Sequence, residues 1–174
     1  MALNPPVRKA LLTAHVLASV GWVGAVLVYL ALGIAAVSSA DTTLVRAAFV
    51  AMDWAAWVVL VPLAVASLVT GVLQSLTTKW GLWRHYWVIF KLAITAVATA
   101  VLLTYTGTLD QFATIATAQP FTGHHLGLLR SPSVIVHSTG ALLLLLTATV
   151  LAVYKPNGLT RRGHRLRQQA RPTT

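Results

Sequence analysis

Histidine is the residue type in this chain that is best suited to chemistry. The sequence contains six histidines, two methionines and no cysteine, so disulfides, iron–sulfur clusters and thiolate metal sites are excluded. His15 and His137 lie inside long uncharged stretches, and His85 lies at the edge of another. Neutral imidazole is a common ligand of haem iron and of transition metals. We therefore expect cofactor or metal binding to depend on His15, His85 and His137.

Depth along the helices limits which histidines can act together. His15 lies six residues past the nearest lysine, which is about 9 Å at 1.5 Å per helical residue. His85 lies on the same side, so His15 and His85 could form one site. His137 is near the opposite surface and could instead pair with His124 or His125 if the loop that carries them folds back. The sequence permits both sites and requires neither.

Each histidine also has a structural interpretation that involves no ligand. His15 could simply hydrogen-bond a neighbouring helix, a contact that contributes about 0.6 kcal/mol on average. His85 stands among Trp, Arg and Tyr residues, as an interfacial side chain would. His124 and His125 lie in a polar loop, where solvation is the usual state. Nucleophilic or carboxylate-pair catalysis has no support, because the chain has no Glu and its three Asp residues lie near one surface.

Four long apolar segments must position these residues. Apolar residues form 57% of the chain and charged residues 9%, whereas a soluble domain has about 25% charged residues. A helix needs about 20 mostly apolar residues to cross a bilayer core of about 30 Å. Four segments meet this requirement: Ala10 to Val37, Trp54 to Leu76, Trp87 to Thr106 and Pro132 to Tyr154. The sequence therefore predicts an all-α membrane protein with one four-span domain, residues 1–158, and a basic cytoplasmic tail, residues 159–174.

Charge is sorted between the two sides of these spans. Eleven of the thirteen Lys and Arg residues lie in the N-terminus, in residues 79–91 or in the tail, whereas Asp41, Asp53 and Asp110 lie in the other two connections. Short loops rich in Lys and Arg stay in the cytoplasm, so we expect a multi-pass protein of the bacterial plasma membrane with both termini inside. The net charge of +10 then reflects topology and attraction to anionic lipid headgroups. No nucleic-acid-binding module accompanies it.

Local features carry further expectations. Thr42 to Met52 is predicted to form a short interfacial helix in the first outer connection. Pro62 removes one backbone hydrogen bond and should kink the second span near the preceding turn. Lys91 should snorkel back to the cytoplasmic surface. The connection from Lys79 to Trp87 matches an aromatic belt at headgroup level, and the tail after Lys155 is expected to be mobile.

Small and weakly polar side chains recur along each span. The second span carries Ser67, Gly71 and Ser75 at four-residue spacing, with Gln74 alongside. The first span has a similar stripe of Ala and Gly, and the third has Thr and Ala. Helices in lipid gain no hydrophobic drive from meeting each other, so such faces are where they pack. With short connections between neighbours, the spans are predicted to form an antiparallel four-helix bundle.

Parts of the chain resemble known membrane proteins. The segment from His15 to Gly24 resembles the His-x6-Trp-x-Gly helix of copper-resistance-D-like membrane proteins. The whole chain is similar to a bacterial, often actinobacterial, family of four-span integral membrane proteins of unknown function. The segments that carry this likeness are Thr70 to Leu76, Trp80 to Val88 and Ala148 to Pro156. The resemblance covers about residues 8–162 and implies a fold and a membrane location.

The resemblance also bears on the histidines. His15, His85 and His137 fall on matching histidine positions of that family, whereas His124 and His125 do not. No activity is established for the family itself. The broader group of copper-resistance membrane proteins and four-helix b-type cytochromes implies haem or copper handling, by analogy.

These observations lead to one expected function and two alternatives. We expect a protein that binds haem b through His15, His85 and His137 and passes electrons between a quinol pool or partner and an acceptor. The first alternative is a non-catalytic accessory subunit that packs against a larger membrane protein or against copies of itself. The second is handling of copper or another metal by the same histidines. Copper(I) favours Met and Cys ligands, and the chain has two Met and no Cys.

Overall fold

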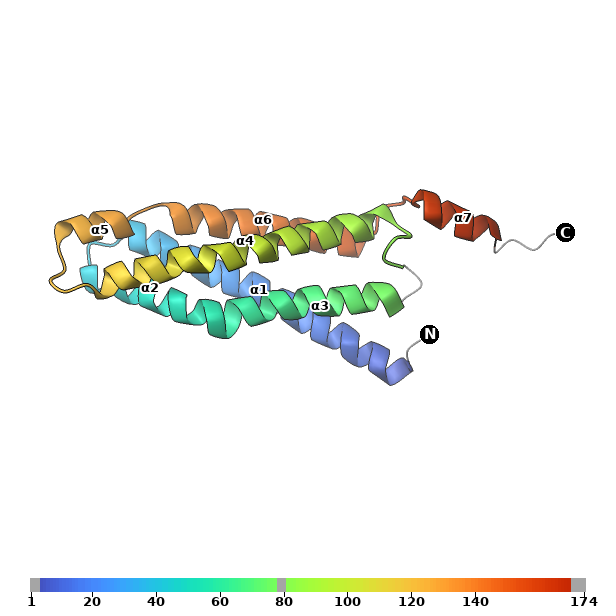
Figure 1. The fold of residues 1–174 in the computed structure, drawn as a ribbon, viewed down its shortest axis with the longest axis horizontal. Coiled ribbons are helices and arrows are strands. Elements are labelled where there is room, and N and C mark those ends of the chain that lie inside the picture. The colour runs from blue at the N-terminus through green and yellow to red at the C-terminus, as the bar shows by residue number, and fades with distance from the viewer. Residues whose placement is uncertain (1–3, 78–80, 170–174) are drawn as a thin grey trace.

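The computed structural model describes residues 4–77 and 81–169. Helices account for most of this part of the chain (Figure 1). In chain order they are α1 (Pro5–Ser38), α2 (Thr42–Ala55), the π-helical turn η1 (Ala56–Leu60), α3 (Val61–Thr77), α4 (Tyr86–Thr117), α5 (Gly123–Leu129), α6 (Ser133–Tyr154) and α7 (Arg161–Gln169). No strand occurs within these residues, apart from one isolated β-bridge between His85 and Leu159.

Four long apolar helices form an antiparallel bundle, as predicted. They comprise α1, the continuous unit α2–η1–α3, α4, and the pair α5–α6, and each is 32 to 36 residues long. The helix α1 packs against α2–α3 and α6, and α4 packs against the same two neighbours. Thus α1 and α4 occupy opposite corners of a four-cornered bundle. The start of α1 and the end of α6 lie at the same end of the bundle (Figure 1).

We call this end, where α4 begins and α6 ends, the basic end. The opposite end, where α1 ends and α2 begins, is the acidic end. Two spans are longer at the acidic end than the sequence predicted: the second begins at Thr42 rather than near Trp54, and the third ends at Thr117 rather than near Thr106. The chain is a multi-pass membrane protein, since all four units are long and apolar enough to cross a bilayer.

The segment Thr42 to Met52 was expected to form a separate interfacial helix, but it does not. It is the first part of the second spanning unit and begins at Asp41, whose carboxylate accepts a hydrogen bond of 2.8 Å from the Thr43 backbone N–H. Val45, Ala48, Phe49 and Met52 are buried in the bundle. The same apolar face that suggested contact with lipid packs against other helices instead.

Pro62 bends the second spanning unit where the sequence predicted a kink. The π-helical turn η1 ends two residues before Pro62, and the backbone N–H of Val61 bonds to the carbonyl of Ala56, five residues back. Proline has no N–H to donate and its ring crowds the preceding turn, so the helix widens there. The unit changes direction at this point (Figure 1).

Exposed aromatic side chains mark two levels along the bundle. Trp83 and Tyr86 are 57% and 49% exposed at the basic end, and Trp54 and Trp57 are 66% and 57% exposed farther along. The helical path from Trp54 to Thr77, the last residue of α3, is about 35 Å long, which matches a bilayer core of about 30 Å with its interfaces. Two further residues of the predicted belt, Lys79 and Trp80, lie outside the described residues. The part of α2 that precedes Trp54 extends the bundle about 18 Å beyond the outer aromatic level.

The interior of the bundle differs between its two ends. The apolar core lies mostly toward the acidic end, and its largest fully buried members are Trp22, Phe49, Met52, Leu109, Leu129, Val45 and Val134. Toward the basic end, several of the buried positions are polar: His15, Ser67, Ser75, Thr95 and Thr99. A polar interior at membrane depth is costly unless its groups bond to one another. The basic half is therefore where a functional site is expected.

The basic tail, which was expected to be mobile, forms the short helix α7 up to Gln169. Leu159 forms the isolated β-bridge with His85, and the Thr160 N–H bonds to the Arg84 carbonyl at 3.0 Å. These contacts hold the start of α7 against the segment that precedes α4. Residues 170–174 lie outside the described part of the chain.

Candidate functional site: a histidine–lysine contact inside the bundle

His15 is the best-enclosed histidine of the described chain. It lies on α1 with 7% of its surface exposed and faces α3. Its Nδ1 atom is 3.0 Å from Thr70 Oγ1, and a Cβ atom added at Gly71 would lie 3.1 Å from its Cε1 atom. The predicted stripe of small residues on the second span is therefore confirmed as a packing face. Glycine at position 71 leaves the space that the imidazole fills.

Lys91 reaches His15 from the opposite corner of the bundle. Its Nζ atom, on α4, lies 3.1 Å from His15 Nε2. The prediction that Lys91 snorkels to the surface is wrong, because the ammonium group has a partner inside the bundle. The sequence did hold a signal: Lys91 follows His85 by six residues, and His15 follows Lys9 by six. Equal spacing from the same membrane surface places the two side chains at one depth.

The direction of each hydrogen bond follows from the groups involved. With Lys91 protonated, its ammonium can only donate, so Nε2 of His15 is then the acceptor and the ring proton is assigned to Nδ1. That Nδ1–H donates to Thr70 Oγ1, and the Thr70 hydroxyl donates to the Ala66 carbonyl at 2.5 Å. One directed chain of hydrogen bonds thus runs from Lys91 on α4 through His15 on α1 to α3.

Further polar contacts surround this chain. The hydroxyls of Ser19 and Ser67 lie 2.8 Å apart and join α1 to α3. Gln74 Nε2 donates to the Leu11 carbonyl at 3.1 Å, which also joins these two helices. The sequence places Gln74 beside the face predicted for helix packing, and a contact between helices is what it makes. Together these contacts fix the two walls between which His15 lies.

No side-chain carboxylate balances the charge of Lys91. The chain has three acidic residues in all, and Asp41 caps α2 at the acidic end. Asp53 lies on α2, and Asp110 lies on the distal part of α4. Along their helices, both are about 36 Å from the basic end. A cation at membrane depth without a counter-ion is costly, so the protonated pair places an uncompensated charge inside the bundle.

His85 and His15 do not form one ligand-binding site in this structure. It is the N-cap residue of α4, its backbone pairs with Leu159, and its ring centroid lies 6.4 Å from that of Trp87. The two ring nitrogens of His15 have other partners: Nδ1 contacts Thr70, and Nε2 contacts Lys91. The histidine expected to complete an inner site thus lies at the helix start, next to the tail.

His137 lies on the exposed surface of α6. Its ring stacks on Tyr105 with centroids 4.0 Å apart, and its Nδ1–H donates to the Ser133 carbonyl at 2.8 Å. His125 belongs to the capping box of α5 with Thr122, so it has a local structural role. Across the described ranges, no group of three or more His, Asp or Glu side chains is placed to hold a metal ion.

Haem does not fit His15 as it is arranged here. A haem ligand must offer the lone pair of a ring nitrogen to the iron, and Lys91 lies 3.1 Å from Nε2. The other nitrogen carries the proton that bonds to Thr70. Coordination would require Lys91 to withdraw first.

Comparison of the chain with protein-family models, with curated proteins and with solved structures finds no match. The resemblance to a bacterial four-span family and to copper-resistance-D-like proteins remains a prediction. What the buried contact can do is therefore argued from its geometry and chemistry.

Proposed function

We propose that this is a proton-handling protein of the bacterial cell membrane, with the contact between His15 and Lys91 as its proton-binding centre. The observation that carries the proposal is the 3.1 Å distance between Lys91 Nζ and His15 Nε2. The basic end faces the cytoplasm in this proposal, in accord with the distribution of Lys and Arg. Ionisable pairs inside membrane bundles commonly serve as proton relays.

The chemistry of the centre is a shared proton. When Lys91 gives one proton to Nε2, the lysine becomes a neutral amine and His15 becomes an imidazolium that donates from both ring nitrogens. Thr70 remains within hydrogen-bonding distance of Nδ1 in either state. The pair carries one positive charge in both arrangements, so release of that proton from either residue removes the uncompensated charge.

The proton exchanges with the basic end alone. Lys91 lies five residues after the start of α4, about 8 Å along the helix. Toward the acidic end the interior is filled by apolar side chains such as Trp22, Val26 and Leu60. We infer proton binding from one side, coupled to a partner or ligand, rather than conduction across the bilayer.

Histidine nitrogen spectroscopy tests this centre directly. In nanodiscs with 15N-labelled histidine, His15 should show a protonated Nδ1 and an accepting Nε2, and Lys91→Met should change the His15 signals. Lys9→Met, which removes an exposed lysine of α1 at the same end of the bundle, is the matched control. Unchanged His15 signals in Lys91→Met would overturn the proposal. Proteoliposomes loaded with a pH dye should show no leak beyond that of empty vesicles; a leak that His15→Gln abolishes would contradict one-sided access.

Binding of haem b by His15, His85 and His137, with electron transfer, is the second candidate. A buried imidazole inside the bundle favours it, and the partner at Nε2 opposes it. An oxidised-minus-reduced visible spectrum, with metal analysis of the same sample, decides the matter. Haem bands that are lost in His15→Ala and strengthened in Lys91→Met would support ligation. A colourless, metal-free protein in all three cases excludes both haem and copper handling.

A membrane partner is a third candidate, compatible with the first. Beside Gly24, Gly107 and Gly140 an added Cβ would meet nothing within 4 Å, so three spanning helices offer open glycine positions for a further helix. The partner would be a larger membrane protein or another copy of the chain, and the basic end would attract anionic lipids. Stoichiometric co-purification from native membranes tests this; a free monomer would count against it.

A further inference from the structure

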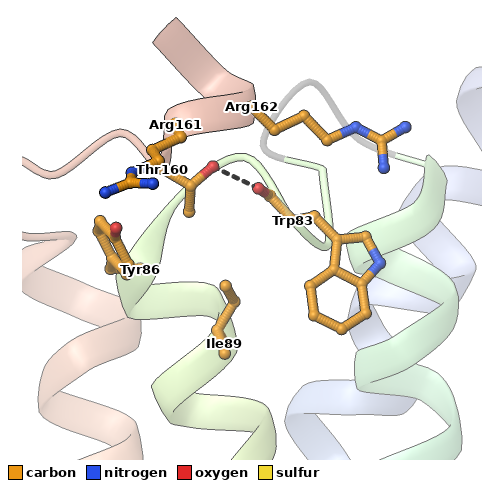
Figure 2. A pocket seen from close by; sticks show the side chains of 6 residues that line it. All are labelled: Trp83, Tyr86, Ile89, Thr160, Arg161 and Arg162. Carbon is orange, nitrogen blue, oxygen red and sulfur yellow. Dashed lines mark hydrogen bonds between the residues drawn. The ribbon is translucent and has the colours of Figure 1, made fainter.

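The basic end carries a pocket whose chemistry differs from that of the His15 centre. Its volume is about 400 Å³, and it is lined by Trp83, Tyr86, Ile89, Thr160, Arg161 and Arg162. These residues come from the segment before α4, from α4 itself and from the start of α7 (Figure 2). The pocket thus joins two parts of the chain that are far apart in sequence.

Backbone and side-chain contacts hold the pocket in shape. The Thr160 hydroxyl donates to the Trp83 carbonyl at 2.6 Å, and the Tyr86 N–H donates to the Gly158 carbonyl at 3.2 Å. A Cβ atom at Gly163 would collide with the Arg84 carbonyl oxygen, so only glycine lets α7 approach this closely. The two arginines are therefore presented on a docked helix rather than on a loose tail.

The pocket is polar on one side and apolar on the other. Arg161 extends above Tyr86, and Arg162 extends on the side of Trp83 (Figure 2). Among the described residues, neither guanidinium has a hydrogen bond or an ion pair with the protein, and both side chains are exposed. Below them, Ile89 lies one turn farther along α4, toward the bilayer. The Trp83 and Tyr86 rings stand at the aromatic level that marks the membrane interface.

We propose that this pocket is a seat for the phosphate headgroup of an anionic phospholipid. Guanidinium groups bind phosphate oxygens through charge-assisted, often paired hydrogen bonds, and Arg161 and Arg162 flank the pocket from opposite sides (Figure 2). The apolar side, with Ile89, would contact the first part of an acyl chain. Charge complementarity supports an anion, since all three carboxylate side chains lie toward the acidic end. Free phosphate shares the headgroup chemistry but has no apolar part to fill the lower side.

Calorimetric titration of the detergent-solubilised full chain tests the seat. The probes are short-chain phosphatidylglycerol, phosphatidylcholine with the same acyl chains, and inorganic phosphate. The R161Q/R162Q variant should lose about 30-fold in affinity for phosphatidylglycerol, from about 1 kcal/mol for each basic residue. The matched control R8Q/K9Q removes the same charge from the same end and should lose less, because charges beyond about 8 Å are screened at physiological salt.

Further measurements distinguish a phospholipid headgroup from free inorganic phosphate as the ligand. Ile89→Ala should weaken phosphatidylglycerol binding and leave the weak binding of inorganic phosphate unchanged. Two results would overturn the proposal: an equal loss of phosphatidylglycerol affinity in the two double variants, or equal affinity of the unmodified chain for phosphatidylglycerol and phosphatidylcholine. Either would show that the basic end attracts lipids without a specific binding site for the anionic headgroup. Inorganic phosphate that binds as tightly as phosphatidylglycerol would assign the pocket to a free phosphate instead. Circular dichroism of each variant checks that the substitutions leave the fold intact.

Discussion

Lys91 and His15 illustrate how one long side chain can define a site. They sit on helices at opposite corners of the bundle, so their contact crosses the bundle axis. A shorter residue at position 91 could not reach the imidazole. The contact therefore depends on the length of lysine as much as on its charge, and methionine is the closest uncharged replacement in length.

A double-mutant cycle should detect this contact as a coupling energy. Intramembrane hydrogen bonds average about 0.6 kcal/mol and reach about 1.7 kcal/mol. We expect His15→Ala and Lys91→Met to be coupled within this range, measured as the free energy of unfolding during SDS titration in micelles. His137→Ala combined with Lys91→Met serves as the control and should be additive within about 0.5 kcal/mol. Additivity in the first cycle would mean that the contact does not form.

Gly71 should tolerate a methyl group less well than Gly24. A Cβ at Gly71 would press on His15 Cε1 at 3.1 Å, whereas one at Gly24 meets nothing within 4 Å. Overpacking typically costs about 1–3 kcal/mol, so Gly71→Ala should unfold more easily than Gly24→Ala in the same SDS titration. It should also shift the 15N signals of His15. Equal stability of the two variants would show that the imidazole can move aside freely.

At the scale of the elements, the second spanning unit shows what the sequence can and cannot predict. Pro62 and its kink follow from covalent chemistry and were predicted. The start of the helix at Thr42 was not, because an amphipathic segment has the same pattern whether its apolar face meets lipid or other helices. The prediction for Lys91 failed for a related reason: snorkelling and pairing both suit a lysine near a helix end, and only the opposing helix decides between them. The depths of the histidines along their helices, in contrast, could be predicted from the helical rise per residue alone.

Replacing Pro62 should straighten this unit. The chain has no cysteine, so spin labels at Leu44→Cys and Leu76→Cys have no background, and both positions are exposed. In Pro62→Ala the missing N–H is restored and the bend should relax, which lengthens the distance between the labels in a pulsed electron resonance measurement. Pro132→Ala, beside α6, should leave that distance unchanged. An unaltered distance in Pro62→Ala would assign the bend to packing rather than to proline.

For the whole molecule, orientation is the property on which the other proposals depend. Charge distribution predicts that the basic end is cytoplasmic. Single cysteines at Ser39, which is half-buried at the acidic end, and at Asn157, which is exposed at the basic end, report on the two sides. An impermeant maleimide should label Ser39→Cys in intact cells and Asn157→Cys only after permeabilisation. The reverse pattern would place the proton-binding centre near the outer surface.

The depth of Lys91 also places its charge within the electric field of an energised membrane. A distance of about 8 Å from the basic end is about a quarter of a 30 Å bilayer core. One elementary charge that crosses the full membrane is worth about 2.3 kcal/mol per 100 mV, so a quarter of the path is worth about 0.6 kcal/mol per 100 mV. If the basic end faces the cytoplasm, as proposed, a proton that enters from that end must move against a membrane voltage that is negative inside. The charge of the centre would then follow the membrane voltage as well as the pH, so respiring and de-energised cells would hold His15 and Lys91 in different states.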